Sequence, residues 1–270
     1  ATLMIVSTSL VGDYFKEHDR HKFMGYQSAF MAIGGVFFVV GGGFLSDINW
    51  RFPFGIYFIG LVLLPFVILF LKEKKIESTQ EELSIDIGKN MLVVYFLAFI
   101  YMLLFFILPT QIPFLLIEKF EASGKMAGTV IATAFFCNAL GAIAFSKLKK
   151  YLNFIAIYLI GITLMALGFS LVGVINHIYF FFITSPILGF AGGIMMTNAT
   201  AWMLSKTSHE KRVKSSGYFT SAIFLGQFLS PIVFHPFLDF LEIQDFFLYI
   251  GLSLFFVSFI SFSLLKIRQK

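Results

Sequence analysis

Charged residues are scarce in this 270-residue chain, and their scarcity excludes the ordinary classes of soluble protein. Asp, Glu, Lys and Arg make up 13% of the residues, whereas about 25% is usual in a globular domain. Hydrophobic residues make up 58%, and the chain holds 38 phenylalanines. A soluble core of this length cannot bury so much apolar surface. The composition therefore predicts a protein embedded in lipid.

Cysteine is almost absent as well. The single cysteine, Cys137, excludes a disulfide framework and any multi-cysteine metal site. Gly124-Lys125-Met126 lacks the Ser or Thr and the earlier Gly of a phosphate-binding loop. His18 and His21 lie three residues apart in a basic loop, where we expect no metal. We therefore expect no cofactor, no metal and no enzymatic activity.

The few charged residues divide the chain into long apolar segments. A helix that spans a bilayer needs about 20 apolar residues, and most of the segments have about this length. One uncharged segment, 151–205, is too long for one helix and divides at Asn176-His177. The sequence predicts an all-α polytopic membrane protein with nine segments, the first too short to cross: 1–12, 23–45, 52–71, 90–117, 126–146, 151–174, 178–205, 215–238 and 246–265.

Lys and Arg alternate in number between successive loops. Of the 20 Lys and Arg residues, 17 lie in the odd-numbered loops and the C-terminal tail, and only Arg51, Lys119 and Lys125 lie elsewhere. Cytoplasmic loops carry such an excess of basic residues, so we expect a multi-pass protein of the plasma (inner) membrane with a cytoplasmic C-terminus. The net charge of +5 is then a topology signal, and nucleic acid is not an expected partner.

The longest polar segment has mixed charges and is typical of a solvated cytoplasmic loop. It divides the chain into the remaining part of an N-terminal bundle at 1–71, a central loop at 72–90 and a six-helix C-terminal bundle at 91–270.

Two loops share one pattern at an offset of 192 residues. The matching residues are Arg20, Lys22, Gly25 and Tyr26 in the first loop and Arg212, Lys214, Gly217 and Tyr218 in the second. Both loops hold the same place in the predicted topology, as an internal repeat requires. The offset places the start of the first bundle before residue 1, so we expect a fragment that lacks about 100 N-terminal residues of a six-plus-six arrangement.

These loops resemble those of the major facilitator superfamily of secondary transporters, with this chain as its fourth to twelfth helices. Asp13-Tyr14-Phe15 with Arg20 and Gly25 is similar to the family's loop between helices four and five. The segment from Arg212 to Gly217 is similar to the equivalent loop between helices ten and eleven. The family's pattern at the end of helix five is matched by Gly42, Gly43, Asp47, Trp50 and Arg51. The resemblance implies a two-bundle fold with about nine of twelve transmembrane segments, a small-molecule substrate and a monomer in the lipid bilayer.

The chain also departs from this family. The Gly-Pro pair of proton-antiporting drug exporters falls on Phe38 and Val39, and Phe145 and Ser146 replace an Asp-Arg pair after helix eight. A charge-locked cytoplasmic gate and simple anchoring of the topology are equally good interpretations of the charged loop residues. The gate residues that the resemblance implies are Asp13, Arg20, Gly25, Gly141, Lys149, Lys150, Arg212 and Gly217.

Uncharged polar residues inside the apolar segments are the candidates for a substrate cavity. A charge at the centre of a span costs about 2.5–3.5 kcal/mol, and none lies there, so a coupling proton has no evident carrier in this chain. An amide in lipid either binds substrate or ties two helices together. The candidates are Gln111, Asn138, Thr197, Asn198 and Gln227, of which the resemblance favours Gln111, Asn198 and Gln227.

Small residues predict where helices approach closely. Gly34 and Gly41 are seven residues apart, as are Gly35 and Gly42, so each pair lies on one helix face. With Gly128, Ala132, Ala139 and Ala142, they predict close contact between segments 23–45 and 126–146. Pro109 and Pro113 predict either a kink at an outer gate or a helix end.

The sequence therefore predicts a secondary transporter that moves a small solute by alternating access. The lack of buried charge favours neutral, amphipathic or cationic-lipophilic solutes, and efflux of drug-like compounds is favoured over uptake of a nutrient such as a sugar or organic solute. A membrane enzyme or a non-transporting membrane protein is a weaker alternative, because the spans lack clustered catalytic residues and the loop motif is repeated.

Overall fold

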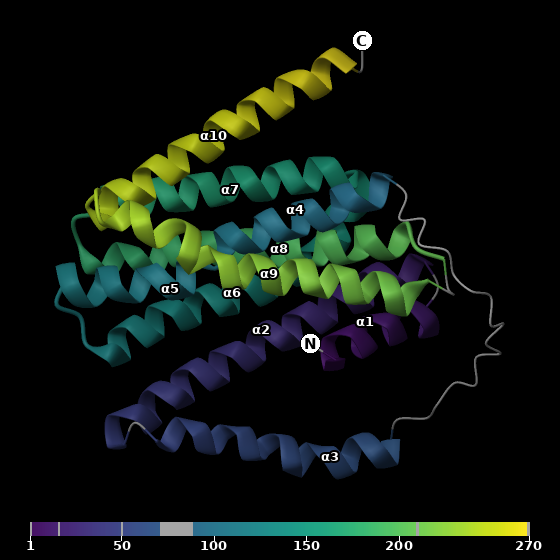
Figure 1. Cartoon of the computed structure of the whole chain (residues 1–270), viewed down its shortest axis with the longest axis horizontal. Helices are drawn as coiled ribbons and strands as arrows, with labels where there is room; N and C mark the ends of the chain where they lie inside the picture. Colours follow the sequence, from purple (N-terminus) through teal and green to yellow (C-terminus); the bar gives the residue numbers. More distant parts are fainter. Residues whose placement is uncertain (1, 16, 50, 71–88, 209–210, 269–270) are drawn as a thin grey trace.

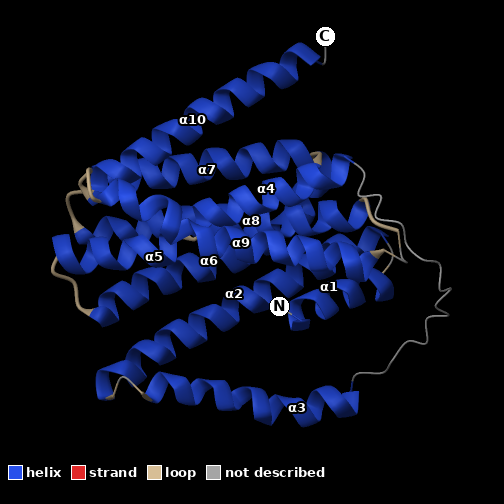
Figure 2. Ribbon diagram, viewed as in Figure 1, coloured by secondary structure: helices blue, strands red, loops and turns tan. Residues whose placement is uncertain are grey.

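The structure is a computed structural model that describes residues 2–15, 17–49, 51–70, 89–208 and 211–268. In this part of the chain the elements are helices joined by short loops, without strands (Figure 2). The N-terminal elements are α1 (Thr2–Tyr14), α2 (Glu17–Ile48), the 3-10 helix η1 (Phe52–Phe58) and α3 (Ile59–Phe70). They are followed by α4 (Lys89–Phe105), α5 (Ile107–Phe114), the π-helix η2 (Leu115–Lys119), α6 (Gly124–Tyr151), α7 (Phe154–Val174), η3 (Ile178–Phe180), α8 (Phe181–Ser205), α9 (Arg212–Leu238) and α10 (Ile243–Arg268).

The described residues of each of the nine predicted apolar segments are almost all helical, so the all-α polytopic prediction is confirmed. Among the described residues, seven helices are long and apolar enough to cross a membrane, and Phe54–Phe66 forms a shorter apolar helix. Helix α1 has 13 residues, fewer than the roughly 20 that a crossing needs, as the sequence predicts.

Local chemistry explains several helix boundaries. Pro109 has no N–H to donate to the carbonyl of Phe105, where α4 ends, because proline removes one helical hydrogen bond. Helix α6 begins after Ser123, whose hydroxyl accepts a hydrogen bond from the backbone N–H of Met126 at 3.2 Å. Asn153 caps α7 in the same way by accepting from the N–H of Ala156 at 2.8 Å. Such caps satisfy the donors that a helix start leaves open.

The long helices lie roughly side by side, with α1–α3 on one side of the bundle of α4–α10 (Figure 1). Helix α6 packs against α8 and α2, α7 against α10, and α4 against α9. We call the end that carries Lys147, Lys150 and Arg212 the basic end, and the end that carries Lys119 and Glu242 the opposite end. In Figure 1 the basic end is at the right.

Small residues bring α6 and α8 into backbone contact. A Cβ atom added at Gly189 would collide with the backbone of Ala134, and one added at Gly193 would collide with the backbone of Asn138. Close backbone approach of this kind is a common means of helix association in membranes. It forms the centre of the C-terminal bundle, on which α4, α7 and α9 pack.

Candidate solute-binding cavity

A cavity of about 680 Å³ lies at the opposite end of the bundle, between α5, η2, α9 and the start of α10. This volume is within the 300–1,000 Å³ range of small-molecule sites. Its wall is mostly apolar, with four polar side chains. The lining residues are Pro109, Thr110, Gln111, Pro113, Phe114, Glu118, Pro231, His235, Leu238, Leu241 and Ile243.

Gln111 is the buried amide of this cavity, with 5% of its surface exposed. Its neighbour Thr110 already donates its hydroxyl to the carbonyl of Phe106 at 2.7 Å. Gln111 makes no side-chain hydrogen bond to any residue in the described part of the chain. Its amide atoms are not among the fully enclosed ones that lack a partner, so they are reachable from the cavity. A solute group or a water molecule in the cavity can form hydrogen bonds with them.

Glu118 and His235 add two titratable groups to the cavity wall. Glu118 lies on η2 and His235 in the last turn of α9. Both side chains are exposed. Sequence reasoning missed both residues, because each lies close to the end of an apolar segment and looks like an interfacial residue. Only the packing of α5 against α9 brings them to the same cavity as Gln111.

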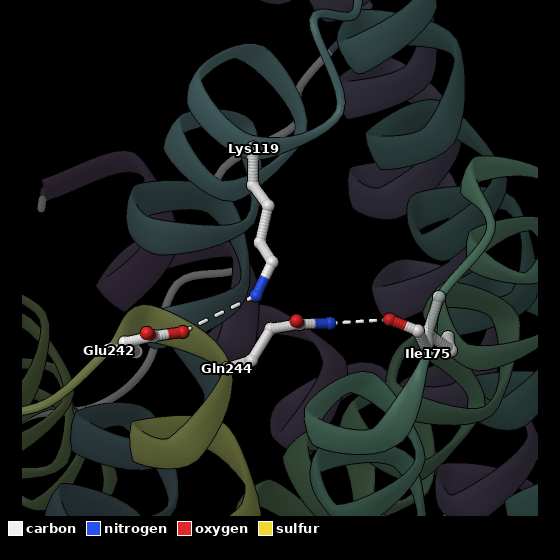
Figure 3. A network of polar contacts seen from close by, with 4 residues as sticks. All are labelled: Lys119, Ile175, Glu242 and Gln244. Atoms are coloured by element: carbon white, nitrogen blue, oxygen red, sulfur yellow. Dashed lines mark hydrogen bonds and ion pairs between the residues drawn. The ribbon is translucent and has the colours of Figure 1, made fainter.

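Polar contacts join the loops next to this cavity (Figure 3). Lys119, at the end of η2, forms an ion pair of 3.5 Å with Glu242 before α10. Gln244 donates its side-chain amide to the carbonyl of Ile175 at the end of α7. The ion pair is exposed, whereas Gln244 is buried. Together these contacts tie α7, α10 and η2 at the opposite end.

Two other predicted cavity amides bond within the bundle. Asn198 on α8 is fully buried and donates to the carbonyl of Phe154 at 3.0 Å, at the start of α7. Gln227 on α9 is half-buried and donates to the sulfur of Met102 on α4 at 3.6 Å. Neither residue lines the cavity that contains Gln111. Their contacts are those of residues that tie neighbouring helices together.

The remaining two cavity candidates face the interior of the C-terminal bundle. Thr197 on α8 is fully buried, and its hydroxyl has no hydrogen-bond partner among the described residues. Asn138 on α6 is half-buried, and its amide nitrogen would lie 2.9 Å from a Cβ atom added at Gly192. Asn138 therefore packs at the close contact of α6 with α8.

Most predicted gate residues lie at the basic end. The side chains of Asp13 and Arg20 lie outside the described ones. Arg212 begins α9 and is buried, and Gly217 is half-buried one turn later on the same helix. Gly141 packs against the backbone of Phe190.

The two predicted gate lysines lie near the end of α6. Lys149 donates to the carbonyl of Leu152 at 3.4 Å and lies 4.3 Å from the ring centre of Phe154. Lys150 is exposed. Both line a second cavity, between α2 and α6.

The predicted contact between α2 and α6 is present, and we call it the α2/α6 seam. Ala29 and Ala32 of α2 cluster with Ala139 and Ala142 of α6. The closest approach is at Gly25, where an added Cβ atom would lie 2.7 Å from the carbonyl oxygen of Ala142.

The other glycines of α2 contribute unequally to the seam. A Cβ atom at Gly35 would lie 3.2 Å from the ring of Phe135. At Gly34 it would meet only Phe38 of the same helix, and at Gly41 and Gly42 it would meet nothing within 4 Å. The seam is thus close from Gly25 to Gly35, whereas Gly41 and Gly42 have open space around them; between these positions Val39 still packs against the main core.

The family model described as Major Facilitator Superfamily matches residues 1–93 and 94–270. The chain belongs to the Major Facilitator Superfamily. Members of this superfamily are transporters, so the protein is a membrane transport protein with a small-molecule substrate and not an enzyme.

A comparison with solved structures supports this fold. The structure of the human organic anion transporter MFSD10 (TETRAN) is similar, with a TM-score of 0.79 at 17% sequence identity, over 95% of this chain and 67% of that chain. At this identity the likeness establishes the superfamily fold alone. The sequence matches no curated protein. Among the described residues, no three His, Cys, Asp or Glu side chains are grouped so that they could hold a metal ion.

Proposed function

We propose that this superfamily member is a secondary transporter that exports small, amphipathic, drug-like compounds by alternating access. Two bundles, at 1–71 and 91–270, would expose one solute site to each side of the membrane in turn. The observation that carries the proposal is an asymmetry between the two ends. The α2/α6 seam is close at the basic end, whereas the Gln111 cavity lies at the opposite end.

This asymmetry is typical of one conformer of an alternating-access cycle. Met24 of α2 is 1% exposed and belongs to the main core cluster of the C-terminal bundle. Gly41 and Gly42, farther along α2, have no neighbour that a Cβ atom would meet within 4 Å. If the basic end faces the cytoplasm, as the distribution of Lys and Arg favours, this conformer is closed to the cytoplasm and open to the outside.

The lining of the cavity favours an amphipathic solute. Apolar side chains such as Phe114, Leu238 and Ile243 supply most of the wall, and Gln111 supplies a buried amide. Sites of this kind gain affinity from apolar contact and fix orientation with a few polar groups. Glu118 and His235 at the same wall favour solutes with a polar or weakly charged end, and they offer positions at which a coupling proton could bind.

The direct test is transport by the full-length protein in proteoliposomes, with a panel of fluorescent neutral, cationic and anionic amphipathic solutes and an imposed proton gradient. We expect flux of at least one amphipathic solute out of the compartment in contact with the basic end. Sugar flux in the reverse direction would replace export by nutrient uptake. A complete lack of flux and of binding would contradict the transport proposal.

A pair of matched variants tests the site. Gln111→Leu removes an amide from the cavity wall, and Gln227→Leu removes one that lies against Met102. A hydrogen bond is worth about 0.5–1.5 kcal/mol net, so we expect Gln111→Leu to weaken solute binding about 3- to 10-fold. We expect Gln227→Leu to change the solute Kd less than twofold. The reverse order would exclude this cavity as the solute site.

A further inference from the structure

A second cavity, of about 580 Å³, lies at the basic end between α2 and α6. Four lysines line it, Lys22 from α2 and Lys147, Lys149 and Lys150 from α6, together with the carboxylate of Asp19. This excess of positive charge lies beside the α2/α6 seam. The proposed solute site, the Gln111 cavity, lies at the opposite end and shares no lining residue with this pocket.

Three of these lysines belong to two regular helix faces. On α2, Lys22 is followed by Tyr26, Phe30, Ile33 and Phe37 at helical spacing, and all five side chains are exposed. On α6, exposed side chains at the same spacing are Phe136, Leu140, Ile143, Lys147 and Lys150. Residues three and four apart share one face of a helix. Each face is therefore apolar along its length and basic at one end.

The two faces lie on the same side of the seam. The contact residues Gly25, Ala29 and Ala32 of α2 each precede a member of its exposed face by one position, and so do Ala139 and Ala142 of α6. The two helices run in opposite directions (Figure 1). In such a pair, the residue that follows a contact residue on one helix and the residue that follows a contact residue on the other point to the same side of the seam. Tyr26 and Ile143, the apolar members nearest the basic end, both line the pocket.

We propose that this pocket binds the phosphate group of an anionic phospholipid, whose acyl chains lie along the apolar strip of Tyr26, Phe30, Ile33, Ile143, Leu140 and Phe136. Basic pockets between transmembrane helices are known sites for anionic head groups. Lysines at helix ends extend their apolar stems along the protein and place the ammonium at head-group level. The pocket and the strip together therefore match both parts of one lipid molecule.

The contacts of the lysines indicate which of them bind the phosphate. Lys149 is already engaged, because it donates to the carbonyl of Leu152 and lies over the ring of Phe154. The ammonium of Lys22 lies 5.8 Å from the ring centre of Tyr26, which holds it on the exposed face. We assign the phosphate contacts to Lys22, Lys147 and Lys150. A free phosphate would use only these lysines, whereas the continuous apolar strip favours a lipid.

Native mass spectrometry of the full-length protein in detergent measures this site directly. Titration with palmitoyl-oleoyl phosphatidylglycerol and with the matching phosphatidylcholine should give tighter binding of the anionic lipid, by about tenfold or more. Each lysine near a membrane surface contributes about a fivefold change in affinity for an anionic lipid. The triple variant Lys22→Gln, Lys147→Gln and Lys150→Gln should therefore lose the preference, and the corresponding Lys→Arg triple variant should keep it.

Two controls separate a built site from general surface charge and from a site for free phosphate. The variant Lys206→Gln with Lys214→Gln removes exposed lysines at the basic end but outside the pocket, and should keep the preference. Glycerophosphoglycerol, the head group without acyl chains, should compete poorly for bound phosphatidylglycerol. Equal binding of the two lipids, equal loss in the Lys206 and Lys214 control, or full competition by the head group alone would each overturn the proposal. Monodisperse elution of every variant verifies that it is folded.

Discussion

The sharpest prediction concerns Gly25, the closest point of the α2/α6 seam. In Gly25→Ala, the new Cβ atom would lie 2.7 Å from the carbonyl oxygen of Ala142, whereas ordinary contacts begin at 3.4 Å. The two helices must therefore separate by several tenths of an ångström at the basic end. Overpacking of this kind costs about 1–3 kcal/mol. In the proposed alternating-access cycle this contact belongs to the conformer closed at the basic end, so we expect the equilibrium to shift towards the other conformer by a factor of about 5 to 150.

Accessibility of the Gln111 cavity measures this shift. In a Cys137→Ala background, Thr110→Cys places a thiol in the cavity wall, where a water-soluble maleimide can label it. Labelling follows the population of the conformer in which this cavity is open, so adding Gly25→Ala should slow it, by at most the factor by which the equilibrium shifts. Gly41→Ala is the matched control, because its Cβ atom meets nothing within 4 Å and it gains the same helix propensity of about 1 kcal/mol. Equal labelling rates in the two glycine variants would refute the assignment of the seam as a closing contact.

Three further predictions concern stability in detergent, measured as the Tm of thermal unfolding. Gly189→Ala should lower the Tm clearly, because the added methyl collides with the backbone of Ala134 and overpacking costs about 1–3 kcal/mol; an unchanged Tm would show that α6 and α8 can separate freely. Asn198→Ala should have a smaller effect, since its bond to the carbonyl of Phe154 is worth about 0.6 kcal/mol on average in membrane bundles, and a loss as large as that of Gly189→Ala would contradict this estimate. Lys119→Gln should leave the Tm nearly unchanged, because exposed ion pairs such as that with Glu242 are worth about 0.2–1 kcal/mol; a large decrease would mean that this ion pair holds the loops together.

The positions of charged residues predict the helices of this protein well. In a membrane, a spanning segment must be long, apolar and internally hydrogen-bonded, so charges and helix ends coincide. Lys147 and Lys150 mark the end of α6, and Asn176 and His177 mark the break between α7 and η3. These are local constraints, and a single sequence contains them.

The cavity could be predicted only in part, because it depends on which helices become neighbours. Gln111, Asn198 and Gln227 are equivalent in sequence, as uncharged amides within apolar segments. Packing gives Asn198 a carbonyl partner and Gln227 a sulfur partner, whereas Gln111 faces the cavity. Likewise, Lys22 and Lys147 are 125 residues apart and look like separate topology signals until α2 packs beside α6.

The centre of the α2/α6 seam consists of residues without a rotatable side chain. Gly25, Ala29, Ala32, Ala139 and Ala142 have no χ1 rotamers to rearrange, so movement along them changes no side-chain conformational entropy. Only a few larger side chains beside this line, Met24 in the main core and Phe135 against Gly35, would have to repack if one helix slid past the other. The resistance of the seam to sliding is therefore concentrated in these few side chains.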